Sequence, residues 1–228
     1  MRIAVLGTGI VGRTLAARLA GLGHEVAIGT RDPAQTLART DPDAMGNPPF
    51  ASWHTAHANV GLEPYPEAAA AAELIVNATA GTGSLQALRD AGEANLDGKI
   101  IVDVANPLDF SRGFPPTLDP VNTDSLGEQI QQEFPGTRVV KTLNTMNCLV
   151  MVEPARVPGD HSVFLCGNDA GAKKTVSELL ASFGWPPGAV TDLGDISGAR
   201  GMEMVLPLWL RLLQTFGDGD FNFAVRRA

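Results

Sequence analysis

The residues with the clearest capacity to bind a ligand lie near the start of the chain, in the run Gly7-Thr8-Gly9-Ile10-Val11-Gly12. In this G-x-G-x-x-G pattern Gly7 permits a tight turn, Gly9 lets a phosphate approach the backbone, and Gly12 lets a helix lie close to a strand. A helix that begins here presents free N–H groups and the positive end of its dipole to an anion. An apolar run precedes the glycines and a helical pattern follows them, so the sequence predicts a dinucleotide site rather than a structural turn.

The end of the second apolar run indicates which dinucleotide binds. NAD-binding units usually place Asp or Glu there, about 20 residues after the glycines, to bind the ribose 2′-hydroxyl. Here the position holds Thr30-Arg31, and a guanidinium with a hydroxyl would instead bind a 2′-phosphate. Asp32 precedes Pro33 and is interpreted as the N-cap of the next helix. The alternative for Arg31 is an ordinary surface arginine, but the charge pattern favours NADP(H).

Small and polar residues follow three later apolar runs, which we expect to be buried strands. They are Ala78-Thr79, Ala105-Asn106-Pro107 and Asn144-Thr145. In a doubly wound sheet the carboxyl ends of the strands border the ligand crevice, where bulky side chains would block a cofactor. The alternative for the stretch after Thr79 is a plain loop with a helix N-cap at Gly83 or Ser84. The irregular, proline-rich residues 109–122 are a candidate cleft edge.

Alternating strands and helices must place these groups together. Through residue 144 the chain has about six predicted strands separated by helices, which predicts an α/β fold of Rossmann type with a doubly wound parallel sheet. Beyond it we expect a small C-terminal α/β lobe, with strands at 161–166, 190–193 and 221–225 and helices at 170–183 and from about 199. We therefore assign residues 1–145 to an NADP(H)-binding Rossmann domain and residues 146–228 to an acceptor or dimerisation lobe.

The helix expected from about residue 199 is apolar nearly all round, so we predict that it is buried on most sides. It either fills the core of the small lobe or packs against a partner subunit, and a homodimer is expected.

Composition restricts the partners. The 228 residues include 17 Lys and Arg against 25 Asp and Glu, a net charge of −8, which argues against nucleic acid or an anionic membrane as a partner. The sequence has neither a signal-peptide pattern nor an apolar run of about 18 residues, so a cytoplasmic protein without a membrane span is expected. Cys148 and Cys166 are expected to be reduced and buried. His54 and His57 share a helix face without an evident third ligand, so no metal site is predicted.

At these residues the chain resembles the NADP oxidoreductases that use the deazaflavin coenzyme F-420, to which the cytoplasmic domain of STEAP-type membrane metalloreductases is related. The similarity extends over nearly the whole chain. It includes the Gly7–Gly12 loop, Gly29-Thr30-Arg31, the segment 139–145, Cys166-Gly167-Asn168-Asp169, and Leu206-Pro207-Leu208 with the closing Phe221 strand.

The resemblance implies that NADPH lies on the N-terminal domain and that a flat acceptor, coenzyme F-420 or a flavin, stacks on its nicotinamide in a cleft between the lobes. Thr8, Thr30 and Arg31 match the positions that bind the 2′-phosphate. Asn144, Thr145 and Met146 match those that line the nicotinamide and acceptor site. The chain departs from the family pattern at Asn144-Thr145, where the archetype has His-Thr, in the loop after Thr79, and in an insertion between Arg39 and Trp53.

Hydride transfer to an electron-poor ring asks mainly for alignment of two carbons about 3–3.5 Å apart. Amides or backbone N–H groups can stabilise the charge that develops on the acceptor carbonyl. No general acid is required, so no catalytic residue is predicted. Lys141, at a strand end, is expected either to attract an anionic acceptor from the cleft or to be solvated.

Two other functions stay open at this point. One is an NADPH-dependent reductase of a small imine or carbonyl substrate. The other is a non-catalytic NADP(H) sensor, which would have a closed or filled acceptor cleft.

Overall fold

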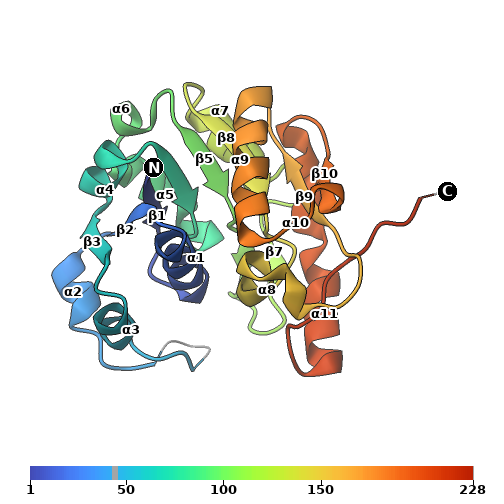
Figure 1. Ribbon diagram of the computed structural model, residues 1–228, viewed down its shortest axis with the longest axis horizontal. Helices are drawn as coiled ribbons and strands as arrows, with labels where there is room; N and C mark the ends of the chain where they lie inside the picture. Colours follow the sequence, from blue (N-terminus) through green and yellow to red (C-terminus); the bar gives the residue numbers. More distant parts are fainter. Residues whose placement is uncertain (43–45, 228) are drawn as a thin grey trace.

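A single mostly parallel sheet organises the residues that the computed structural model describes, 1–42 and 46–227 (Figure 1). Its eight strands have the order β10-β9-β8-β5-β4-β1-β2-β3. The strands are β1 (Arg2–Leu6), β2 (Glu25–Thr30), β3 (Val60–Pro64), β4 (Leu74–Asn77), β5 (Ile100–Asp103), β8 (Arg138–Thr142), β9 (Val163–Cys166) and β10 (Val190–Asp192). The first six of these are parallel, as predicted, in the order of a doubly wound Rossmann sheet.

The last two strands extend the same sheet. β9 runs antiparallel to β8, and β10 pairs parallel with β9. The boundary expected after residue 145 therefore falls between β8 and the following helix, within one continuous sheet. A separate antiparallel pair, β6 (Leu108–Asp109) and β7 (Thr117–Leu118), lies in the segment predicted to be irregular.

Helices cover both faces of the sheet, because β-strand side chains alternate between the faces. On β1, Ile3 and Val5 belong to one hydrophobic cluster, and Ala4 and Leu6 to the other. The first cluster includes α1 (Ile10–Gly21), α3 (Phe50–Ala56), α8 (Cys148–Val152) and α9 (Ala170–Phe183), of which α1 and α9 lie in front of the sheet in Figure 1. The second includes α4 (Tyr65–Ala71), α5 (Gly81–Ala91), α6 (Glu93–Leu96), α7 (Leu126–Glu133) and α10 (Ala199–Met204).

The remaining elements are α2 (Pro33–Leu37), α11 (Leu206–Phe216) and the short 3-10 turns Pro154–Arg156, Pro187–Ala189 and Ile196–Gly198. Asp32 is the predicted N-cap of α2, since its Oδ1 accepts a hydrogen bond from the Gln35 N–H at 2.9 Å. The surface loop predicted for residues 40–49 contains residues 43–45, which lie outside the described residues. No helix in the described part of the chain has the length and apolarity needed to cross a membrane.

The alternative interpretation of the stretch after Thr79, with a helix N-cap at Gly83 or Ser84, is wrong for α5. The helix begins at Gly81, with Ala80 as its N-cap, rather than after Gly83 or Ser84. Ser84 does not cap the helix because its hydroxyl is buried and accepts a hydrogen bond from Asn77 Nδ2 at 3.2 Å.

Two predictions for the helix expected from about residue 199 are also wrong, namely that it is one continuous helix and that it is buried on most sides. The long apolar helix is divided into α10 and α11, and Pro207 lies in the first turn of α11, where its missing N–H is tolerated. Only Leu206 and Leu210 of α11 are buried, whereas Leu208 and Phe216 are 55% and 56% exposed. The homodimer expected through this helix stays a prediction.

Residues 221–225 form no strand. A paired strand would form a regular series of backbone hydrogen bonds, but here most of the hydrogen bonds involve side chains. The Ser162 N–H donates to the Phe223 carbonyl at 2.8 Å, but the Val225 N–H donates to the Ser162 hydroxyl and Asn222 Nδ2 donates to the Ser162 carbonyl. In Figure 1 the chain leaves the body of the molecule after this contact.

A buried ion cluster lies in the second layer of the core. Lys141 of β8 is fully buried, and its Nζ lies 2.8 Å from Asp103 Oδ2 of β5 and 2.8 Å from Glu203 Oε1 of α10. The same Nζ donates to the Ala105 carbonyl at 2.5 Å. Three acceptors therefore match the three donors of the ammonium. Both expectations for Lys141 were wrong, because it contacts neither the cleft nor the solvent.

The carboxylate of Glu203 connects this cluster to α7. Its two oxygens accept the backbone N–H groups of Leu126 and Gly127, at 3.0 and 3.1 Å, in the first turn of that helix. Burial raises the pKa of Glu203, and the nearby Lys141 ammonium opposes the rise. Burial by itself would lower the pKa of Lys141, but the Asp103 and Glu203 carboxylates outweigh it and raise that pKa.

We expect Lys141→Met to lower the free energy of unfolding by about 3–5 kcal/mol at neutral pH, because two buried carboxylates lose their counter-charge. Without the ammonium, the main influence that opposes the burial-induced rise in the pKa of Glu203 is lost, so the folded variant binds a proton there more tightly than the unfolded chain does. The difference in the free energy of unfolding between the original protein and the variant should therefore become smaller as the pH falls from 7 to 5. Urea denaturation at each pH measures it.

Lys174→Met is the matched control, because Lys174 is exposed and its Nζ lies 4.0 Å from Glu178 Oε1. We expect its free energy of unfolding to change by no more than about 0.5 kcal/mol. Equal stability losses in the two variants would contradict a structural role for the cluster.

Helix α1 lies close to β1 at Gly12. A Cβ on Gly12 would stand 2.2 Å from the Gly7 carbonyl oxygen and 3.6 Å from Val5 Cγ1. Gly21, the last residue of the same helix, has no atom within 4 Å of that position.

Gly12→Ala should therefore lower the free energy of unfolding by about 1–3 kcal/mol, because the helix must move away from the strand. Gly21→Ala should cause no loss and can raise it by up to about 1 kcal/mol, since alanine favours the helix. Thermal or urea unfolding of the two variants distinguishes the steric cost at Gly12 from the gain in helix propensity at Gly21. A tolerated Gly12→Ala would show that the close contact is not required.

Candidate functional site

The turn between β1 and α1 has the geometry of an anion site. Gly7 has a φ of +122°, which favours glycine, and its N–H donates to the Gly29 carbonyl at 3.1 Å. The Cβ position of Gly9 is open space, and no side chain caps the N-terminus of α1. The turn lies against the next strand end, because a Cβ on Gly7 would stand 2.4 Å from the Ala78 carbonyl oxygen. Backbone N–H groups at the helix start can therefore bind a phosphate.

At the end of β2, Arg31 is exposed and forms no hydrogen bond or ion pair with another described residue. Thr30 is only 6% exposed, and its hydroxyl lies 2.8 Å from the hydroxyl of Thr36. The hydroxyl of Thr30 is therefore directed into the protein, while the guanidinium of Arg31 is available to a ligand. The carboxylate of Asp32 is held by its capping role in α2.

The ends of β5 and β8 are joined by two asparagines. Asn106 Nδ2 donates to the Asn144 carbonyl, and Asn144 Nδ2 donates to Asn106 Oδ1, both at 2.9 Å. Asn144 Nδ2 also donates to the Met202 carbonyl of α10 at 3.2 Å. Both N–H groups of the Asn144 amide are thus used inside the protein, while Asn106 keeps one N–H for another partner.

Unpaired atoms and backbone strain occur next to this pair. Asn144 Oδ1 and the Thr145 hydroxyl are buried without a hydrogen-bond partner among the described residues. Leu143 has a φ of +62°, and the Asn144 N–H donates across it to the Thr142 carbonyl at 2.8 Å. This is a tight turn that a leucine adopts at a cost of about 1–3 kcal/mol. Strain of this kind is concentrated at functional sites.

A hollow of about 240 Å³ opens where β4 and β5 end. It is lined by Val11, residues 78–82, residues 104–106, Leu108 and Phe110. It unites five of the predicted site residues, namely Val11, Ala78, Thr79, Ala105 and Asn106. Pro107, Asn144, Thr145 and Met146 are buried and do not line it. Gly81 lies close to the opposite wall, because its Cβ would stand 2.1 Å from the Asn106 carbonyl oxygen.

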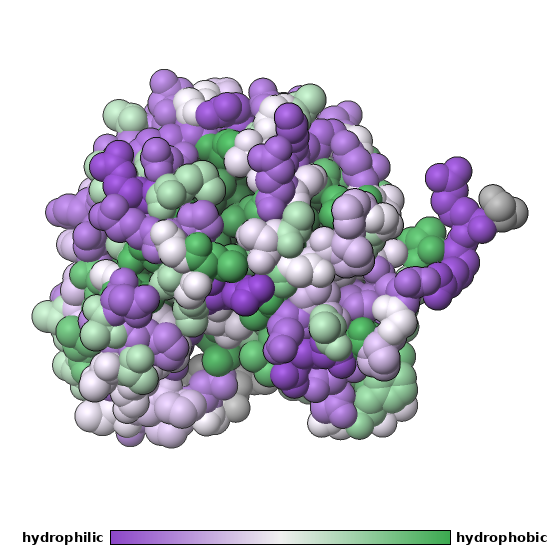
Figure 2. All heavy atoms as spheres, viewed as in Figure 1, coloured by the Kyte–Doolittle hydropathy of each residue, from purple (hydrophilic) through white to green (hydrophobic). Residues whose placement is uncertain are grey.

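Sequence reasoning placed residues 109–122 at the edge of the cleft but did not identify Phe110. The side chain is 56% exposed and lines the hollow. No periodic pattern marks it, because it lies in an irregular segment. Figure 2 shows the surface notched along its lower edge, between the half that carries α1 and α3 and the half that carries α8 and α11.

Buried polar groups support the hollow from below. Asn77 Nδ2 donates to Asp103 Oδ1 at 2.9 Å, and the Thr79 hydroxyl donates to Asn77 Oδ1 at 2.7 Å. The Ala105 N–H donates to Asp103 Oδ1 at 3.2 Å. Since the other oxygen of Asp103 binds Lys141, the ion cluster fixes the loops that line the hollow.

Both cysteines, His54 and His57 contact hydrogen-bonding groups within the protein. Both cysteines are free and buried, and burial raises the pKa of the Cys166 thiol to about 12. His54 Nε2 lies 3.0 Å from the Val60 carbonyl, and His57 Nδ1 lies 2.8 Å from the Trp53 carbonyl. Within residues 1–42 and 46–227, no three His, Cys, Asp or Glu side chains could hold a metal ion.

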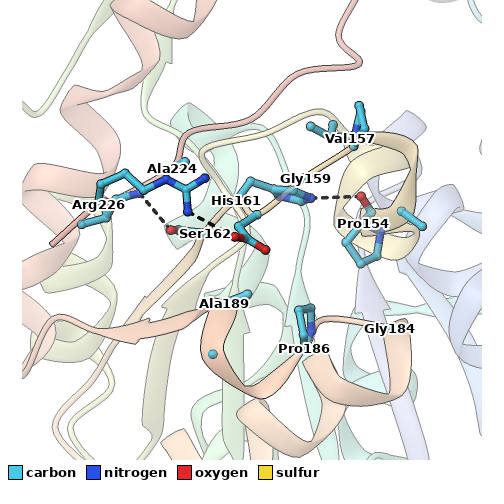
Figure 3. Close-up of a pocket in the computed structure, with 15 residues that line it drawn as sticks. Pro154, Val157, Gly159, His161, Ser162, Gly184, Pro186, Ala189, Ala224 and Arg226 are labelled. Carbon is cyan, nitrogen blue, oxygen red and sulfur yellow. Dashed lines mark hydrogen bonds and ion pairs between the residues drawn. The ribbon is translucent and has the colours of Figure 1, made fainter.

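A second hollow, of about 590 Å³, is bordered by residues 154, 155, 157–162, 184, 186, 188, 189 and 224–226 (Figure 3). None of the predicted site residues lines it. Both ring nitrogens of His161 are occupied there, Nε2 by the Pro154 carbonyl at 3.1 Å and Nδ1 by Asn222 Nδ2 at 2.9 Å.

Sequence comparison relates the chain to NADP-dependent oxidoreductases, in agreement with the nucleotide-binding geometry of the glycine turn. Residues 2–107 match the family model "NADP oxidoreductase coenzyme F420-dependent". The chain is 28% identical to the F420-dependent NADP reductase of Methanocaldococcus jannaschii, over 93% of this chain and 92% of that protein. It is 31% identical to the metalloreductase STEAP3 of Rattus norvegicus, over 91% of this chain but only 38% of the relative's length.

Solved structures give the same result. A crystal structure from Arthrobacter sp. FB24, described as a candidate F420-dependent NADP reductase, is 60% identical, has a TM-score of 0.95, and each chain covers the whole of the other. An imine reductase from Streptomyces aurantiacus has a TM-score of 0.61 at 17% identity, over 94% of this chain and 63% of that chain, and shares the fold alone. This chain belongs to the family of coenzyme F420-dependent NADP oxidoreductases.

Proposed function

We propose that this protein transfers a hydride between NADP(H) and a deazaflavin or flavin acceptor. The observation that carries the proposal is the hollow beside Val11 and Asn106, where the strand order of the sheet reverses between β1 and β4. Small residues and one amide line it, with Phe110 at its rim. This lining suits a flat ring that needs alignment rather than acid–base catalysis.

The residues fit the cofactor. The open backbone at Gly9 and the uncapped start of α1 would hold the pyrophosphate. Arg31 would bind the 2′-phosphate, with Thr8 facing it from the turn and Thr30 orienting the end of β2. When bound, NADPH supplies the hydride that the oxidised acceptor receives.

On the acceptor side, the remaining N–H of Asn106 would donate to a carbonyl in the hollow and stabilise negative charge there. The strained turn at Leu143 holds Asn144 against Asn106, so that the donor is fixed before a ligand arrives. Ala78, Thr79 and Ala105 would leave room for the nicotinamide, and Thr145 and Met146 would support it from beneath.

A reductase of small imines needs a proton donor as well as a hydride. The described residues that line the hollow include no titratable side chain, which favours a deazaflavin or flavin.

Arg31→Gln should weaken NADPH binding by about 10- to 100-fold, because a charge-assisted contact with the 2′-phosphate contributes about 1.5–3 kcal/mol. NADH, which lacks that phosphate, should bind the variant and the original protein alike. Fluorescence titration of both nucleotides measures the effect, and Arg211→Gln on α11 controls for the loss of a positive charge. Unchanged NADPH affinity would refute the role of Arg31.

Stopped-flow oxidation of NADPH should proceed with a deazaflavin, FMN or FAD and not with small cyclic imines. Each acceptor mixed with NADPH in the absence of protein gives the background rate. Oxidation by imines alone would support the imine reductase instead. Oxidation by no acceptor, with tight NADPH binding, would support a sensor protein.

A further inference from the structure

We propose that Arg39, which lies after α2 and just before the insertion, is a second guanidinium for the 2′-phosphate of NADP(H) beside the phosphate-binding turn. The proposal rests on the NADP(H) binding proposed above and identifies a further residue that determines the choice of dinucleotide.

Arg39 borders a hollow of about 460 Å³ whose other wall is the turn between β1 and α1. The hollow is lined by Thr8, Gly9, Arg13, residues 38–42, Pro49 and Phe50. The side chain of Arg39 is exposed and has no hydrogen bond or ion pair with another described residue. Its guanidinium is therefore available to a ligand that binds at Thr8 and Gly9.

Arg13 holds the two walls of this hollow together. This buried side chain donates from Nε to the Thr8 carbonyl at 2.8 Å and from Nη1 to the Pro48 carbonyl at 2.6 Å. Its Cζ lies 5.4 Å from the centre of the Phe50 ring, a cation–π contact, and Phe50 is itself part of the core. The end of the insertion is thus fixed to the phosphate-binding turn, and its Pro49 and Phe50 line the same hollow as Arg39.

Arg31 and Arg39 both lie close enough to Tyr65, beside β2, for their charges to act on its hydroxyl. Tyr65 packs there, since its Cδ1 lies 3.2 Å from the Cβ position of Gly29. Burial raises the pKa of the Tyr65 hydroxyl, and the positive charges of Arg31 and Arg39 both oppose the rise. Two arginines on different segments therefore act on the same small region.

Charge balance gives a reason for two cations. A phosphate monoester carries about −1.5 to −2 charges at neutral pH, so one guanidinium leaves part of that charge uncompensated. Asp41 lines the same hollow and adds a negative charge that a phosphate must overcome. The pair Arg39 and Asp41 therefore offers two substitutions with opposite expected effects.

The test measures the dissociation constants of NADPH and NADH by fluorescence titration of the full chain. We expect Arg39→Gln to weaken NADPH binding about tenfold, equivalent to about 1.4 kcal/mol, and to change NADH binding less than twofold. Asp41→Asn should tighten NADPH binding about two- to threefold without an effect on NADH. Arg211→Gln should change neither, and circular dichroism melts confirm that each variant is folded.

Competition with 2′,5′-ADP, which carries the 2′-phosphate without the nicotinamide, should show the same tenfold loss in Arg39→Gln. If Arg31→Gln weakens NADPH while Arg39→Gln does not, or if Arg39→Gln weakens both nucleotides equally, the role of Arg39 is refuted and that of Arg31 is retained. A protein that binds NADPH no better than NADH before substitution would refute both.

Discussion

The ammonium of Lys141 is buried in the sheet and must find an acceptor for each of its three N–H groups, because an unpaired charge in the core costs several kcal/mol. Its acceptors come from β5, from the loop after β5 and from α10. Glu203 then uses the same carboxylate to cap α7. One charged group thus fixes the relative positions of two strands, one loop and two helices. Loss of one member leaves a buried charge unpaired and is costly, even though a well-packed apolar core of equal volume can be as stable as the intact cluster.

This constraint extends to the candidate site through Asp103. One carboxylate oxygen binds Lys141 and the other accepts hydrogen bonds from Asn77 and from the backbone of Ala105. Asn77 in turn holds Thr79. The loops at the ends of β4 and β5 are therefore held by buried, satisfied polar groups, while small and apolar side chains with the amide of Asn106 face the hollow. Such a division suits a reaction that depends on the alignment of two planar groups, since precise positioning comes from the rigid layer beneath.

The two ends of the proposed site would recognise their ligands by different physical interactions. The nucleotide end presents uncapped backbone N–H groups and unpaired guanidinium groups, which attract phosphate by charge. This local positive region exists on a chain whose net charge is −8. The acceptor end is nearly uncharged, and its features are shape, the amide of Asn106 and the exposed ring of Phe110. In the proposed function, charge would give a sharp preference for NADPH over NADH, whereas shape and one amide would admit several flat acceptors.

The features that could be predicted from the sequence are those that depend on neighbouring residues. The six parallel strands follow from the alternation of apolar runs and helical patterns, Asp32 caps α2 because Pro33 follows it, and the glycine turn follows from Gly7 and Gly12, which have no side chain where the backbone approaches closely. Local patterns could not show that Lys141 is buried, that Asn106 pairs with a residue 38 positions away, or that α11 leaves Leu208 exposed. These facts were decided by the tertiary structure, because the strand order determines which distant side chains meet, and a buried polar group is stable only where that order brings it a partner.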